Sequence, residues 1–274
     1  MRSRSSRVGD IFRSVMLGII EGLTEFLPIS STGHMVLAMP WLGIDPEEPL
    51  WKAFLYFVQI GAILAVVIYF GRSLMRQLLM RPTRELGRHV ATKVVVGVFP
   101  GAVAGLLLDD LMESYLEWEL PVAIALIVGG VAMWWIEKKY RKAAGPTIEE
   151  MSLRQAFLIG ACQCIAIIPG TSRSMATIMG GLMVGLPAAT AAQFSFYLAI
   201  PTLLGAGVLR VAKHPESLRG ENLSIMLVGF FVSFLVAWIA VAGFMRYIQA
   251  RSLAPFALYR ILLGSVVLIY WLTR

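Results

Sequence analysis

The sequence contains little charge and few of the residues that bind metals in soluble enzymes. Charged side chains make up 15% of its 274 residues, and only two cysteines and three histidines are present. Cys162 and Cys164 are two positions apart in an apolar, helical pattern, so their side chains point to different sides and cannot bind one metal ion together. We therefore interpret both cysteines as packing residues.

Acidic residues are also scarce relative to basic ones, and the formal net charge is +7. Such an excess could indicate nucleic-acid binding. The lysines and arginines, however, lie in short loops between apolar runs, as juxtamembrane charges do. We therefore expect membrane lipids as partners and no nucleic acid.

Apolar residues make up 58% of the chain, and the mean hydropathy of +0.74 exceeds that of soluble proteins. A helix crosses a hydrocarbon core with roughly 20 apolar residues, and runs near that length recur. They lie at Val15–Leu27, Ala53–Phe70, Lys93–Leu108, Pro121–Ile136, Phe157–Ile168, Thr190–Val211, Leu223–Phe244 and Pro255–Leu272. No polar stretch between them is long enough for a second domain, so we expect residues 1–274 to form one integral membrane domain. The Arg-rich start resembles a signal peptide, but glutamates interrupt the first run and no cleavage site follows, so we expect it to be retained.

Two segments of the sequence look like copies of each other. Around Pro28 and again around Pro169, an apolar helical pattern is broken by proline, continues with hydroxyl-rich residues and resumes as a helix. Each copy is followed by three further apolar runs. This pattern predicts an internal duplication into halves of approximately 8–142 and 152–274.

The loop charges predict how the two halves sit in the membrane. The loops at 72–93 and 138–154 are basic, which makes them cytoplasmic, whereas those at 45–48 and 109–119 are acidic and external. If the broken segments crossed fully, the repeats would be parallel. Broken backbone is tolerated in lipid only where protein or a watery cavity surrounds it, which favours re-entrant hairpins. We therefore expect an all-α polytopic protein with six spanning helices, two re-entrant helical hairpins and an inverted-topology repeat.

Two carboxylates interrupt the first apolar run. Glu21 and Glu25 are four residues apart and share one helix face. Buried charge in a membrane segment is costly, so these residues need partners or a function. They could bind a divalent cation such as Mg²⁺ or Ca²⁺, act as a base, or share a proton. The alternative is a structural pair neutralised by Arg173.

Hydroxyl-rich residues follow each proline. Ser30, Ser31 and Thr32 precede His34 at the expected start of a helix, where free N–H groups favour phosphate oxygens. Simple N-capping would also account for the serines, though not for the histidine. We interpret His34 as the only imidazole available to a buried site, because the other two histidines, His89 and His214, lie in loops.

The second hydroxyl-rich stretch adds a permanent positive charge. It comprises Thr171, Ser172, Arg173 and Ser174. The guanidinium fork suits phosphate, and without a ligand it would need a carboxylate such as Glu21 or Glu25 from the other half. Of the remaining buried polar residues, we expect Gln59, Gln163 and Gln193 to make helix–helix hydrogen bonds. Arg260 is expected to be a structural or snorkelling residue.

At these residues the chain resembles the undecaprenyl-diphosphatase family, also called bacitracin-resistance proteins. The resemblance covers nearly the whole chain and runs through Glu21–His34, Gln59–Ala65, Pro169–Ser174, Phe194–Pro201 and Pro255–Arg260. Met175 departs from it, because the family usually has glycine there. The resemblance implies a bacterial inner-membrane enzyme that hydrolyses undecaprenyl diphosphate and recycles the lipid carrier for peptidoglycan synthesis. It also implies two re-entrant hairpins and an active site open to the periplasm.

The resemblance further implies a division of roles within the site. Glu21, Glu25, Ser31, His34, Ser172 and Arg173 carry over as the catalytic set, with Thr32 and Thr171 as supporting phosphate ligands. From the residues themselves, Ser30 and Ser174 join the phosphate-binding group, and Glu21 and Glu25 are the candidate cation ligands. Either Ser31, with His34 as its base, or an activated water could be the nucleophile. A transporter or flippase of the carrier lipid is the alternative function, and a homodimer stays open.

Overall fold

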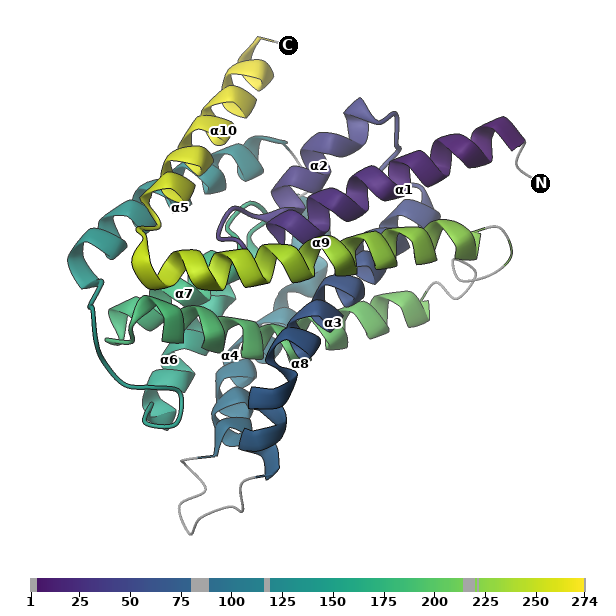
Figure 1. Cartoon of the computed structure of the whole chain (residues 1–274). Coiled ribbons are helices and arrows are strands. Elements are labelled where there is room, and N and C mark those ends of the chain that lie inside the picture. The colour runs from purple at the N-terminus through teal and green to yellow at the C-terminus, as the bar shows by residue number, and fades with distance from the viewer. Residues whose placement is uncertain (1–3, 80–88, 116–118, 214–219, 221, 274) are drawn as a thin grey trace.

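The computed structural model describes residues 4–79, 89–115, 119–213, 220 and 222–273, which form a helical bundle (Figure 1). The first half contains α1 (Arg4–Thr24), α2 (Ser31–Trp41), α3 (Pro49–Leu79), α4 (Val90–Tyr115) and α5 (Glu119–Tyr140). The second half contains α6 (Leu153–Gln163), the 3₁₀ helix η2 (Cys164–Ile167), α7 (Arg173–Met183), α8 (Ala188–Lys213), α9 (Asn222–Ala250) and α10 (Ala254–Leu272). No strand occurs within these ranges, so the all-α prediction is confirmed.

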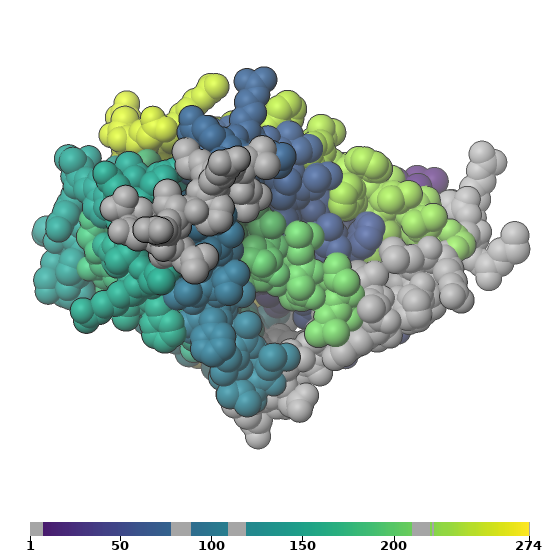
Figure 2. All heavy atoms as spheres, turned by 90° about the horizontal axis from the view of Figure 1, so that it is seen from below, coloured from purple at the N-terminus to yellow at the C-terminus, as the bar shows by residue number. Residues whose placement is uncertain are grey.

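Six helices are long and apolar enough to cross a bilayer: α3, α4, α5, α8, α9 and α10. This confirms the expected six spans, since α1, α2, α6 and α7 are not among them. Many apolar side chains on the spans are exposed. On α4, which crosses the centre of the face in Figure 2, Val95, Phe99 and Leu106 are exposed by 60–80%. Surfaces of this kind are stable against acyl chains rather than water.

The two proline breaks form helical hairpins, as expected. α1 ends at Thr24 and α2 begins at Ser31, whereas α6 passes through η2 before α7 begins at Arg173. The helices α2 and α7 are N-capped by Ser30 and Ser172, which have left-handed φ angles of 72° and 74°. Each serine hydroxyl accepts a hydrogen bond from the backbone N–H three residues later. The N-capping interpretation is therefore correct, and both hairpins make their return by the same local geometry.

Each hairpin packs against the opposite half of the chain. α1 lies along α9, and α6 lies along α4 (Figure 1). The contacts are close because glycines meet backbone: Gly18 lies on the carbonyl of Gly229, and Gly160 lies on the carbonyl of Gly97, with no room for a Cβ atom. In addition, α5 packs against α10, and α3 packs against both α9 and α8. Duplication would produce this reciprocal packing, while the repeat boundaries at 8–142 and 152–274 stay a prediction.

The connection between the halves is held by polar contacts. Lys93 is fully buried in α4, and its ammonium group donates to the carbonyls of Ile148 and Glu149 at 2.7 Å. Gln77 of α3 donates to the Glu149 carboxylate. Of the loops used in the charge argument, residues 80–88 and 116–118 lie outside the described residues, as does His214.

Candidate functional site

The turns of the two hairpins meet inside the bundle and bring the predicted polar residues together. Arg173, at the first position of α7, forms an ion pair of 3.1 Å with Glu25, which follows α1. The other oxygen of Glu25 accepts a hydrogen bond from the hydroxyl of Ser31, the first residue of α2. One carboxylate therefore joins a guanidinium and a hydroxyl that are contributed by separate hairpins.

The guanidinium of Arg173 is held in place on several sides. Besides Glu25, it donates to the Ser195 carbonyl of α8 at 3.0 Å, and it lies 5.7 Å from the ring centre of Phe26. Its Nε atom is buried and has no hydrogen-bond partner among the described residues. The side chain is thus oriented but retains a donor, which suits it to bind an anion.

Glu21 is the most deeply buried acidic residue of the site. It is 1% exposed, and its carboxyl group lies within hydrogen-bonding reach of the Glu25 carboxyl group. One Glu21 oxygen, Oε1, has no partner among the described residues. Since Arg173 supplies one positive charge for two carboxyl groups, the pair favours an additional proton or cation between them.

The hydroxyls of the second hairpin are engaged in holding the two turns together. Ser174 donates to the Leu27 carbonyl at 2.8 Å and lies 3.0 Å from the Ser172 hydroxyl. Thr171 is buried, whereas Thr32 of the first hairpin is exposed. The predicted phosphate ligands therefore lie around one junction, and Thr32 is the most accessible of them.

His34 lies on α2 but does not contact the Ser31 hydroxyl. Its Nδ1 is 2.6 Å from the Ser30 carbonyl, and its Nε2 is 2.7 Å from the hydroxyl of Tyr259 on α10. The Ser31–His34 pair expected for an activated nucleophile is thus not formed, and the carboxylate of Glu25 is the group that accepts from the Ser31 hydroxyl. Tyr259 lies within the matched stretch Pro255–Arg260, but no role was predicted for it because it resembles any other aromatic residue of an apolar helix.

Arg260, next to Tyr259, ties the two turns to α5. It donates to the carbonyls of Pro28 in the first hairpin, Gly170 in the second and Ala125 in α5, at 3.0–3.2 Å. Its side chain is fully buried, so the structural interpretation is right and the snorkelling alternative is wrong. The space beside Gly129 is filled by this guanidinium.

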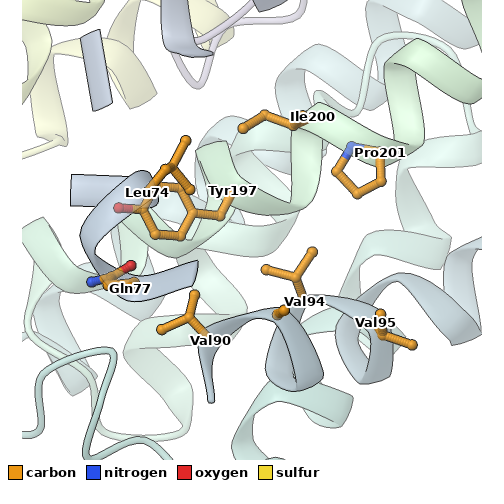
Figure 3. A pocket seen from close by; sticks show the side chains of 9 residues that line it. Leu74, Gln77, Val90, Val94, Val95, Tyr197, Ile200 and Pro201 are labelled. Atoms are coloured by element: carbon orange, nitrogen blue, oxygen red, sulfur yellow. The ribbon is translucent and has the colours of Figure 1, made fainter. Parts of the chain in front are cut away.

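The helix–helix hydrogen bonds expected of the glutamines are not all formed, because Gln163 Oε1 is buried and has no hydrogen-bond partner among the described residues. Gln193 donates to Tyr197 of its own helix. A pocket of about 210 Å³ is lined by Leu74 and Gln77 of α3, Val90, Ala91, Val94 and Val95 of α4, and Tyr197, Ile200 and Pro201 of α8 (Figure 3). No charged side chain lines it, so this pocket is unsuited to a phosphate group.

Comparison with known proteins shows which family and which relatives the chain resembles over nearly its whole length. The model of the family described as "Bacitracin resistance protein BacA" matches residues 14–266. "Undecaprenyl-diphosphatase 1" of Chromobacterium violaceum is 43% identical over 263 residues, covering 95% of this chain and 96% of the relative. "Undecaprenyl-diphosphatase" of Pseudomonas paraeruginosa is 40% identical over 260 residues (95% and 93%), and that of Nitrosomonas europaea is 43% identical over 263 residues (94% and 94%).

Proposed function

Since the chain belongs to the bacitracin resistance protein BacA family, we propose that it is a multi-pass phosphatase of the bacterial inner membrane that hydrolyses undecaprenyl diphosphate. The products are undecaprenyl phosphate and inorganic phosphate, and the reaction returns the lipid carrier to peptidoglycan synthesis. One observation carries the proposal: Glu25, Ser31 and Arg173 from two separate hairpins meet at one junction.

The chemistry of the substrate fits this junction. A diphosphate needs fixed positive charge and N–H donors for its spread negative charge. Arg173 supplies the charge, and the N-termini of α2 and α7 supply backbone donors. Because the polyprenyl tail is apolar, it stays in the lipid beside the exposed apolar helices while the headgroup enters between the hairpins.

The contacts support Ser31 as the nucleophile with Glu25 as its base. The Ser31 oxygen attacks the terminal phosphorus, the anhydride bond breaks and the lipid monophosphate leaves, while the serine proton passes to Glu25. Water then attacks the phosphoserine, the Ser31–phosphorus bond breaks, and Glu25 returns the proton to Ser31.

His34 is suited to the second step. It lies three residues after Ser31 on the same face of α2. A carbonyl can only accept, so Nδ1 carries the proton donated to Ser30, and the lone pair of Nε2 accepts the hydrogen bond from the Tyr259 hydroxyl. We assign the pair of His34 and Tyr259 to take up the proton of the attacking water, with the phenol oxygen receiving that proton as the phenol proton passes to Nε2.

A divalent cation fits the carboxylate pair. Glu21 and Glu25 lie side by side, and Glu21 Oε1 has no other partner among the described residues, so their oxygens would hold Mg²⁺ or Ca²⁺ together with substrate oxygens. No cluster of three or more His, Cys, Asp or Glu side chains occurs in the described part of the chain, which leaves substrate and water to complete the coordination. When bound, the cation would neutralise phosphate charge.

The distribution of exposure supports a periplasmic opening. Thr32 is exposed and His34 is half-buried, whereas Thr171, Ser172 and Ser174 of the second hairpin are buried. The exposed Thr32 lies on α2, which leads to the acidic 45–48 loop expected outside.

Phosphate release from undecaprenyl diphosphate by the purified, detergent-solubilised protein tests the proposal. Arg173→Ala should reduce kcat/KM by about 100- to 1,000-fold, because it removes the only described guanidinium paired to Glu25. The exposed Arg72 of α3 provides a matched control, and Arg72→Ala should retain full activity. Transport of the lipid in liposomes without any phosphate release would refute the phosphatase and favour a flippase.

A further inference from the structure

A polar pocket lies where the end of α5 meets the start of α10, two helices that run side by side (Figure 1). Its volume is about 360 Å³, and it is lined by Trp134, Glu137, Lys138, Arg141, Ser252 and Ala254. The four residues at 134–141 are spaced by three or four positions, so they share one face of the helix end. None of the lining residues belongs to the hairpin junction, so this pocket is separate from the diphosphate site.

The lining of the pocket carries an excess positive charge. The Glu137 carboxylate is buried and accepts a hydrogen bond of 2.6 Å from Arg141. It also accepts from the hydroxyl of Ser252 and the backbone N–H of Leu253, each at 2.7 Å. Because Arg141 offsets the charge of Glu137, the exposed ammonium group of Lys138 remains as the excess charge.

Both basic side chains of the pocket are oriented and still retain N–H donors for a ligand. Arg141 donates to Glu137 and to the carbonyl of Ile248, and these contacts use two of the five N–H groups of its guanidinium. The Lys138 ammonium lies 5.1 Å from the ring centre of Trp134. This cation–π contact orients the ammonium group without using its N–H donors. An oxyanion in the pocket would therefore meet donors from two side chains.

The pocket lies at one face of the membrane, because it joins the last turn of one span to the first turn of another. This face carries the basic connection at 138–154, which is expected to be cytoplasmic. Trp134 and Trp135 are about half exposed there, as aromatic residues at a membrane–water interface are. Anionic lipids make the cytoplasmic surface negative, and basic pockets between spanning helices suit their headgroups.

The surface next to the pocket favours a lipid over a free anion. Val131 lies one turn before Trp134 on α5, and Leu258 lies one turn after Ala254 on α10, so both lie toward the membrane interior. Their side chains are 51% and 58% exposed. A phosphate held in the pocket would thus have an apolar surface beside it on which the acyl chains of the same molecule can lie.

We propose that this pocket binds the phosphate group of an anionic phospholipid from the surrounding leaflet. Lys138 and Arg141 donate to the phosphate oxygens, and Trp134 packs against the glycerol part of the lipid. The ligand is a component of the membrane, so the pocket is a lipid site on the opposite side of α5 and α10 from any role in turnover.

The test compares two neighbouring lysines in the purified, full-length protein. Lys139 also lies in the last turn of α5, 4.7 Å from the ring centre of Trp135, but it does not line the pocket. Lys138→Gln and Lys139→Gln therefore remove the same charge from the same helix end. Native mass spectrometry with added phosphatidylglycerol or phosphatidylcholine measures how much lipid stays bound.

We expect phosphatidylglycerol to bind the unchanged protein more tightly than phosphatidylcholine. Lys138→Gln should weaken phosphatidylglycerol binding by about fivefold, the loss typical of one basic residue beside an anionic headgroup, whereas Lys139→Gln should leave binding unchanged. Thermal unfolding in detergent gives a second readout, because a bound lipid stabilises the folded protein. Phosphatidylglycerol should raise the melting temperature of Lys139→Gln more than that of Lys138→Gln.

Three results would overturn the proposal. Equal losses in the two variants would indicate diffuse attraction to the basic surface rather than a pocket. Equal binding of the two lipids would show that the charge of the headgroup does not matter. Displacement of phosphatidylglycerol by inorganic phosphate at the same concentration would identify a site for free phosphate instead of a lipid.

Discussion

Among single residues, Ser31 has the contact that most directly suggests chemistry, because its hydroxyl donates to the buried carboxylate of Glu25. Ser31→Ala should lower kcat by about a thousandfold or more, as removal of a nucleophile does, while the protein stays folded. Ser233→Ala offers a control: this serine is also buried, and its hydroxyl has no hydrogen-bond partner among the described residues. Turnover that survives largely intact in Ser31→Ala would show that an activated water attacks instead.

The residue types of the site could be predicted from sequence because they are costly in lipid. Glu21, Glu25 and Arg173 stand out among apolar neighbours, and a buried charge needs a partner or a function. The partners of His34 could not be predicted in this way. Ser30 is a neighbour, but Tyr259 is an ordinary aromatic residue of a spanning helix until the fold places it on Nε2.

At the scale of the helices, the two capping serines each make a favourable N-cap hydrogen bond but adopt an unfavourable left-handed backbone conformation. Ser172→Ala should destabilise the protein by about 1 kcal/mol, because alanine loses the cap of α7 and keeps the left-handed φ of 74°. Ser172→Gly should cost only a few tenths of that amount, since glycine adopts this φ without strain. Thermal unfolding in detergent measures the difference, and equal melting temperatures for the two variants would contradict it.

The broken helices themselves were predictable, because proline and hydroxyl residues end an apolar pattern in both halves. The first and last residues of the helices were harder to predict. α1 begins at Arg4, well before the apolar run at Val15–Leu27, and the apolar run at 157–168 is divided between α6 and the tighter η2. Polar residues can extend a helix beyond its apolar run, because each added residue continues the pattern of backbone hydrogen bonds. The hydropathy of the side chains does not reveal this extension.

At the scale of the whole molecule, three spans separate the acidic loop at 45–48 from the basic connection at 138–154. The two must therefore lie on opposite faces of the membrane. In a protein with both native cysteines replaced, Glu47→Cys should react with an impermeant thiol reagent applied from the periplasm. Ala144→Cys should react only after the membrane is permeabilised.

Both positions are exposed, so burial would not explain a failure to react. Labelling of both cysteines from one face would refute the number of crossings between them. If Ala144→Cys reacted from the periplasm and Glu47→Cys only after permeabilisation, three crossings would still separate them. The orientation of the protein would then be reversed, and the site would open to the cytoplasmic side.

Because each hairpin packs against the opposite half of the chain, the order in which the helices are synthesised determines when each contact can form. α1 is made first, yet its packing partner α9 is made near the end, roughly 10–40 s later at ordinary rates of translation. Until residue 173 is made, Glu25 has no Arg173, and until α9 is made, α1 has no carbonyl of Gly229 to lie on. The growing chain therefore carries its costliest carboxylates uncompensated for much of its synthesis, and no partial product that ends before Arg173 holds a complete phosphate site.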